Sequence, residues 1–168
     1  MEILKTATEW AKAEVFSTRF FILFAILFLM AGVGFWQLGK TELARAYIIP
    51  MLVAGALLLT IGLGLFYTNK SRIVQFEKVH ASDPSALVAS ELERAASTLR
   101  EYTVVFKVIP IIIVVAALLI MFVNTPLWRA IGITTIAMMI VILLIDGTAH
   151  ARIDAYYGQL QSIEKQKE

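Results

Sequence analysis

Residues 47–67 read YIIPMLVAGALLLTIGLGLFY, a run without a single charged side chain. About 20 apolar residues in an α-helix cross the ~30 Å hydrocarbon core of a membrane, because each residue adds 1.5 Å. Three more stretches resemble this run, and the four predicted spans are residues 20–38, 47–67, 104–123 and 128–145. The chain is 59% hydrophobic and 17% charged, far more apolar than a soluble domain. The sequence therefore predicts a single-domain, all-α integral membrane protein over residues 1–168.

Several classes of protein are excluded by composition. No stretch alternates apolar and polar residues in the way that marks the strands of a membrane β-barrel. The net charge is only +2 and both signs are mixed, so we expect no nucleic acid among the partners. The chain has no cysteine, which excludes disulfides and thiolate metal sites. It also lacks the common catalytic and nucleotide-binding motifs, so we expect no cofactor and favour a protein that is not an enzyme.

The links between the spans predict how the helices are arranged. Residues 39–46 and 124–127 are short, and short links join antiparallel neighbours, so we expect two antiparallel hairpins. Twelve Lys and Arg residues lie on the side of the termini and of residues 68–103, against three on the other side. The excess of positive charge predicts that both termini and this middle segment are cytoplasmic, in a multi-pass protein of the cytoplasmic membrane.

The segments outside the spans, residues 1–19, 68–103 and 146–168, also carry helical patterns. Asp83 is a good N-cap and Pro84 suits a first helical turn, so we expect a helix to begin at Pro84 and enter the membrane unbroken. Apolar residues then recur at spacings of four and three on this helix and on the extension of the last span. These seams comprise Val88, Leu92, Ala95 and Leu99 on the first, and Ile153, Tyr156 and Leu160 on the second.

The two seams predict a cytoplasmic helical stalk, because they lie on helices that run antiparallel as neighbours. The amphipathic residues 1–19 could complete a four-helix bundle with this stalk or lie flat on the membrane. We favour the bundle, because the polar face of this segment mixes Glu and Lys and so attracts anionic lipid poorly.

Titratable residues gather at the inner end of the last span. Asp146, His150 and Asp154 lie on one helical face at steps of four, and histidine titrates near neutral pH. They fit either the cytoplasmic mouth of an oligomeric ion channel or proton-coupled transporter, or solvated groups on a helix that has left the membrane. Glu77 and His80 form a Glu-x-x-His pair of the kind used in di-iron bundles. All five residues are therefore also candidates for the metal site of a membrane enzyme.

Glycines are spaced along the first two spans. Glycines in apolar helices permit close packing, and we expect this role for Gly32, Gly55, Gly62 and Gly64. The middles of all four spans lack ionisable residues. We therefore favour a non-enzymatic membrane protein that forms a homo-oligomer or binds another membrane or cytoplasmic protein through its stalk.

Overall fold

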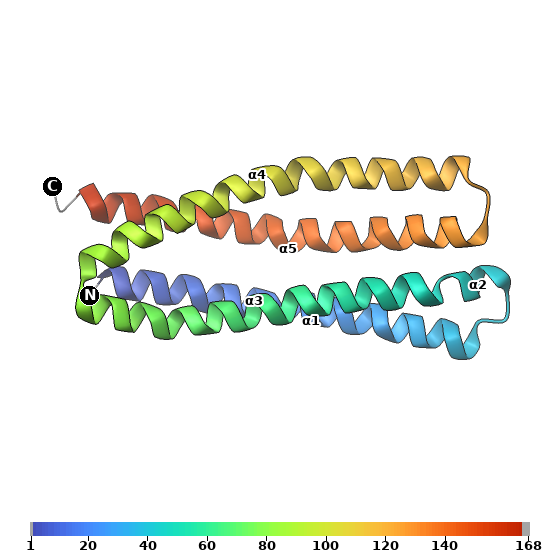
Figure 1. Ribbon diagram of the computed structural model, residues 1–168, viewed down its shortest axis with the longest axis horizontal. Coiled ribbons are helices and arrows are strands. Elements are labelled where there is room, and N and C mark those ends of the chain that lie inside the picture. Colours follow the sequence, from blue (N-terminus) through green and yellow to red (C-terminus); the bar gives the residue numbers. More distant parts are fainter. Residues whose placement is uncertain (1, 166–168) are drawn as a thin grey trace.

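A computed structural model describes residues 2–165, and within them the ordered elements are all helices (Figure 1), which confirms the all-α part of the predicted fold class. Residues 1 and 166–168, at the ends of the predicted extensions 1–19 and 146–168, lie outside the described residues. The helices are α1 (Glu2–Leu38), α2 (Glu42–Ala46), α3 (Ile48–Ser82), α4 (Pro84–Phe122) and α5 (Pro126–Lys165). The four long helices are each long and apolar enough to cross a membrane.

Local chemistry explains where these helices begin. Asp83 has an extended backbone, and its carboxylate accepts hydrogen bonds from the backbone N–H groups of Ser85 at 2.8 Å and Ala86 at 3.2 Å. These bonds satisfy donors that a helix start leaves unpaired, so the start predicted at Pro84 is confirmed. From there α4 continues without a break through Pro110.

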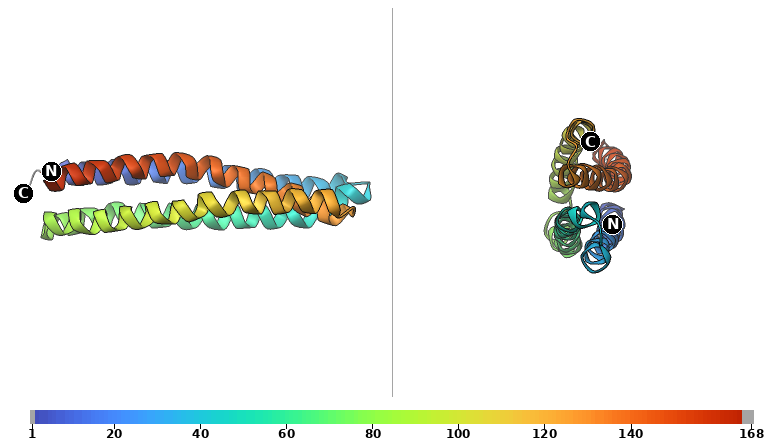
Figure 2. Two further views of the ribbon diagram at one scale, coloured as in Figure 1. Left: turned by 90° about the horizontal axis from the view of Figure 1, so that it is seen from above. Right: turned by 90° about the vertical axis from the view of Figure 1, so that its right-hand side faces the viewer.

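The four long helices lie side by side along the length of the molecule (Figures 1 and 2). α1 packs along α3, and α4 packs along α5, with fewer contacts between these pairs than within them. The turn between α3 and α4 lies at the same end of the molecule as the start of α1 and the end of α5. We call residues 2–19, 68–103 and 146–165 the terminal half, and residues 20–67 and 104–145 the apolar half.

The main core lies in the terminal half and draws on all four long helices. The start of α1 takes part in it, because Ala7 and Ala11 are completely buried and Trp10 is 8% exposed. α1 therefore belongs to a four-helix bundle in this half. Most large side chains of the apolar half lie on its surface, and its smaller core contains Phe21, Ala25, Leu58, Val141 and Ile145.

Glycines bring α1 and α3 close together in the apolar half. A Cβ atom added at Gly55 would lie 2.7 Å from Leu29 Cγ, and at Gly32 and Gly62 the nearest atoms of the facing helix would be 2.9 Å away. Gly64 differs, since a Cβ there meets no atom within 4 Å. It is two residues from Gly62, so it lies on the opposite side of α3.

Candidate functional site

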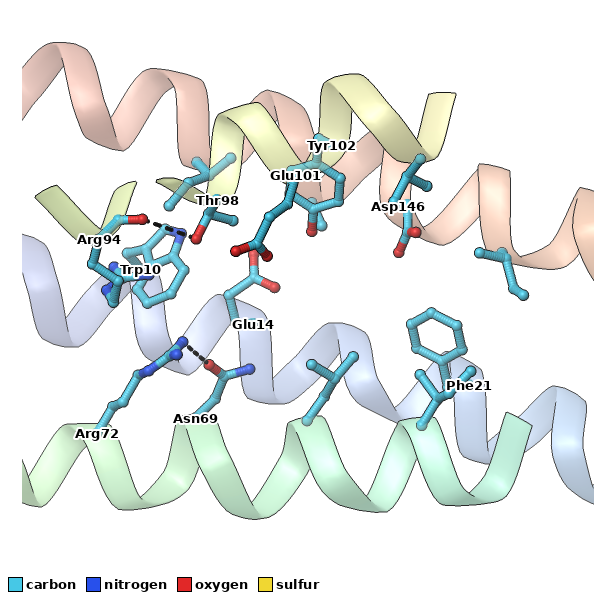
Figure 3. A pocket seen from close by; sticks show the side chains of 16 residues that line it. Trp10, Glu14, Phe21, Asn69, Arg72, Arg94, Thr98, Glu101, Tyr102 and Asp146 are labelled. Atoms are coloured by element: carbon cyan, nitrogen blue, oxygen red, sulfur yellow. Dashed lines mark hydrogen bonds between the residues drawn. The ribbon is translucent and has the colours of Figure 1, made fainter. Parts of the chain in front are cut away.

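A cavity of about 320 Å³ lies where the terminal half meets the apolar half (Figure 3). All four long helices line it. Its charged lining comprises Glu14 from α1, Arg72 from α3, Arg94 and Glu101 from α4, and Asp146 from α5. Charged groups at such a junction are costly unless each has a partner, so we consider them one at a time.

The two signs of charge occupy different parts of the cavity. Figure 3 shows Arg72 and Arg94 beside the Trp10 ring at one end, which we call the basic end. Asp146 lies at the other end near Phe21, toward the apolar half, and the two glutamates lie between. The lining thus changes from basic to acidic to apolar along the helices.

Arg94 at the basic end is held in a buried ion pair. Its Nε and Nη2 atoms donate hydrogen bonds to the two carboxylate oxygens of Glu91, at 2.8 and 2.6 Å, and the Tyr156 hydroxyl donates to Glu91 at 2.8 Å. Burial acts to lower the pKa of Arg94, but the hydrogen bonds and the charge of Glu91 outweigh it and raise the pKa. Burial, followed by the charge of Glu91, raises the pKa of Tyr156.

Aromatic rings surround this ion pair. Trp10 stacks on Tyr156 with 5.2 Å between ring centroids, and the guanidinium carbon of Arg94 lies 4.2 Å from the centroid of the Trp10 ring. Such cation–π contacts contribute roughly 0.5–2 kcal/mol. The network therefore joins α1, α4 and α5 around one buried charge pair.

A second ion pair joins α5 to α1. Arg152 Nε donates a hydrogen bond of 3.0 Å to the carboxylate of Glu14, and both side chains are largely buried. Arg152 is therefore the counter-ion of Glu14, although this carboxylate also lines the cavity.

Arg72 and Asp146 have no ion-pair partner among residues 2–165. Arg72 donates one hydrogen bond, to the side-chain oxygen of buried Asn69 at 2.9 Å, and forms no ion pair within residues 2–165. Burial and the positive charge of Arg94 lower the pKa of Arg72.

Asp146, one residue beyond the predicted span 128–145, has neither a hydrogen bond nor an ion pair within the same residues. Burial and the negative charge of Glu14 raise the pKa of Asp146 to about 6.

His150 and Asp154 do not share the cavity with Asp146. The His150 ring lies edge-on to Tyr102 and Phe106, with 5.6 and 5.4 Å between ring centroids, and Asp154 is exposed. Both residues are absent from the cavity lining, so only Asp146 of this predicted row faces it.

The five metal candidates do not form one group. Glu77 and His80 lie in the last turns of α3, five and eight residues beyond Arg72, and neither lines the cavity. Within residues 2–165, no three Asp, Glu or His side chains are placed so that they could hold a metal ion. The described geometry therefore lends no support to a metal centre built from Glu77, His80, Asp146, His150 and Asp154.

The two seams lie inside the chain's own bundle. Seam residues that are less than 5% exposed are Val88, Ala95, Ile153, Tyr156 and Leu160, and Leu92 and Leu99 pack against them. A partner protein would have to use other faces of the terminal half.

The basic end and its ion pairs were absent from the sequence predictions. The signal for Glu91 is its spacing, three residues after Val88 and four before Ala95, which places it on the seam face of its helix. Trp10 likewise follows Ala7 by three residues on the apolar face of α1. For Arg72 and Arg94 the sequence offers no comparable signal.

The cavity can therefore attract two kinds of group. Arg72 lies at its basic end, and Glu101 and Asp146 lie in its acidic part. None of these three side chains forms an ion pair within residues 2–165. The chain matches no protein-family model, no curated protein and no solved structure.

Proposed function

We propose that the chain crosses the cytoplasmic membrane four times as two antiparallel hairpins, α1 with α3 and α4 with α5, and that its terminal half is cytoplasmic. Large apolar side chains of the apolar half are well exposed, as Met30 at 64%, Ile49 at 69% and Phe122 at 79% illustrate, and lipid is the solvent that suits them. The twelve-to-three distribution of Lys and Arg supports the orientation. The cavity then lies at the inner membrane boundary.

Within this membrane protein, the function that the geometry supports best is binding of a small organic cation in the cavity, coupled to release of a proton from Asp146. The observation that carries this proposal is an unmatched, largely buried carboxylate in a cavity lined by four helices. A volume of about 320 Å³ is at the small end of ligand pockets. Such coupling is the chemistry of a proton-coupled transporter.

The exchange is electrostatically balanced. A protonated Asp146 is neutral, and an arriving cation stabilises the charged carboxylate, so the proton leaves as the cation binds. Cation affinity should therefore increase as the pH rises through about 6. The other titratable groups that line the cavity are Glu14 from α1, Arg72 from α3, and Arg94, Glu101 and Tyr102 from α4.

Partner binding through the stalk, which the sequence favours, has less support in the geometry. The seams that motivated it are buried against one another in the terminal half. We therefore base the proposed function on the cavity.

Binding of tetraphenylphosphonium, a lipophilic cation, to the purified chain in dodecyl maltoside tests this proposal. We expect tighter binding at pH 7.5 than at pH 5, with release of up to about half a proton per cation at pH 6, where about half of the Asp146 carboxyl groups are protonated before the cation binds. The release is read with an indicator dye in weak buffer. Asp146→Asn should weaken binding at pH 7.5 by about tenfold or more and abolish the coupled proton release.

The matched control is Asp154→Asn, which removes an exposed carboxylate from the same helix eight residues away. This variant should bind and release protons as the parent does. Equal binding and equal proton release in the parent and in Asp146→Asn would refute the proposal.

A further inference from the structure

The basic end of the cavity contains more hydrogen-bond donors than acceptors. The Nε1 atom of Trp10 and the Nη1 atom of Arg94 are buried and have no partner within residues 2–165. Trp10 as a whole is only 8% exposed. Leaving a buried donor unpaired is costly, because the donor has given up water without gaining another partner, so two such donors at one place call for an explanation.

The basic end also has fewer acidic partners than arginines. The guanidinium carbons of Arg94 and Arg72 lie 4.2 and 6.0 Å from the centroid of the Trp10 ring, so two cations face one indole. Glu91 compensates Arg94, whereas Arg72 is held by the neutral side chain of Asn69. One positive charge in this end therefore lacks a direct counter-ion in the chain.

These features specify the chemistry of the missing group. Indole and guanidinium groups only donate hydrogen bonds, so their partner must be an acceptor, and the surplus charge requires it to be negative. Phosphoryl and carboxylate groups meet both requirements, and the planar fork of arginine fits their oxygens.

We propose that Trp10, Arg72 and Arg94 form an anion site for a phosphoryl or carboxylate group. The site is separate from the acidic part of the cavity, and it does not depend on proton release from Asp146. One extension does rest on the proposed function: a ligand that fills both parts carries an ammonium and an acid group, and is thus a zwitterion.

The anion has two possible sources, a soluble molecule or a lipid headgroup. Glu14, Glu101 and Asp146 lie between the arginines and the apolar end of the cavity (Figure 3). A lipid phosphate approaching from the apolar end would pass three acidic side chains. We therefore expect the soluble form to bind.

Trp10 itself reports on the site. The other tryptophans, Trp36 and Trp128, are 70% and 46% exposed and lie in the apolar half, so replacing both with Phe leaves Trp10 at the basic end as the single tryptophan. Titration of this variant in dodecyl maltoside with inorganic phosphate, at constant ionic strength set by chloride, should change the Trp10 emission saturably. A half-maximal concentration on the order of 1 mM is expected for a single small anion.

Substitutions at arginines separate the site from general effects of charge. Arg72→Gln should weaken phosphate binding by about tenfold or more, because it removes the charge and keeps an amide donor. Arg72→Lys should restore part of the affinity. Arg100→Gln, which changes an exposed arginine of α4, should leave the titration unchanged.

A second arm tests the lipid source. The single-tryptophan chain is placed in nanodiscs of phosphatidylcholine with and without phosphatidylglycerol. An Arg72-dependent change that appears only with phosphatidylglycerol would retain the site and assign it to a lipid headgroup. If neither phosphate nor phosphatidylglycerol gives an Arg72-dependent change, the site does not exist.

Asp146→Asn in the same background distinguishes this proposal from the proposed function. The phosphate response should survive that substitution, because Asp146 lies at the opposite end of the cavity. If the parent chain binds phosphate but shows no cation binding that depends on Asp146, the proposed function fails while the anion site stands.

Discussion

The terminal half and the apolar half are built from the same four long helices, yet different contacts hold them together. In the terminal half, apolar side chains of all four helices meet in one core, which surrounds the ion pair of Glu91 and Arg94. In the apolar half the helices pack closely in pairs, and a second cavity of about 310 Å³ separates α3 from α5. One sequence thus uses two different means of packing.

The difference follows from the solvent that each half suits. Water drives apolar side chains together, so an amphipathic helix in water must cover its apolar face. Lipid tails are as apolar as leucine, so helices in a membrane associate through close backbone approach and gain little from apolar burial. The first cavity, of about 320 Å³, lies where the terminal half meets the apolar half.

The terminal half should be most sensitive to loss of Glu91. This side chain is 5% exposed and accepts three hydrogen bonds, from Arg94 and Tyr156. Glu91→Ala leaves the Arg94 guanidinium buried without its counter-ion, which should lower the free energy of unfolding by about 3–5 kcal/mol. Thermal unfolding in detergent, followed by circular dichroism, measures the loss.

Glu93 provides the matched control, because it is exposed on the same helix two residues away. Glu93→Ala should change stability by no more than about 0.5 kcal/mol. Equal effects of the two substitutions would mean that the buried ion pair does not hold the terminal half together.

The stability of the apolar half should instead fall when a side chain is added at a glycine where two helices lie close together. A Cβ at Gly55 would lie 2.7 Å from Leu29 Cγ and 3.0 Å from the backbone oxygen of Ala25, so Gly55→Val must push α1 and α3 apart. The cost should be about 1–3 kcal/mol, measured by the same thermal unfolding. Gly64→Val, on the open side of α3, should cost less than about 0.5 kcal/mol. Similar losses at both positions would show that backbone proximity is not what joins these helices.

The helices themselves were predictable from sequence because their signals are local. Apolar runs of about 20 residues and the Asp83–Pro84 pair are signals that lie within one short stretch of the chain, and the structure has helices in those places. The seams were predictable for the same reason, since a spacing of four and three defines a face. What covers that face is a separate question, and the answer involves segments as far apart as α1 and α5.

The contacts that build the cavity were beyond sequence reasoning, because they depend on how each helix is rotated and shifted against its neighbours. Glu14 and Arg152 are 138 residues apart and meet only through such packing. Gly132 was overlooked because it stands alone in its span, yet a Cβ there would lie 2.6 Å from Ile120 Cγ1 on α4. A charged residue on an apolar face, such as Glu91, cannot be assigned a partner by spacing alone.

The smallest effect is expected where the two halves meet, at Asp146. Burial raises the pKa of Asp146 in the folded chain to about 6 from an ordinary value of 3.8, so the folded state holds a proton that the unfolded state releases. Stability from this group is therefore greatest below pH 4, falls between pH 4 and 6, and stays at its lower value above pH 6. Asp146→Asn should remove this dependence and stabilise the chain at pH 7.5 by ~1 kcal/mol, since solvent screens a partly exposed carboxylate.

In a chain of this length, that gain corresponds to a rise of ~2–4 °C in Tm. Scans of parent and variant at pH 4 and pH 7.5 measure it: the two should unfold together at pH 4 and separate at pH 7.5, with the variant the more stable. A variant less stable than the parent at pH 7.5 would mean that the charged carboxylate has a stabilising partner in the folded chain. A gain confined to neutral pH identifies Asp146 as a group retained at a cost to folding, as expected for a residue that serves binding at the junction between the halves.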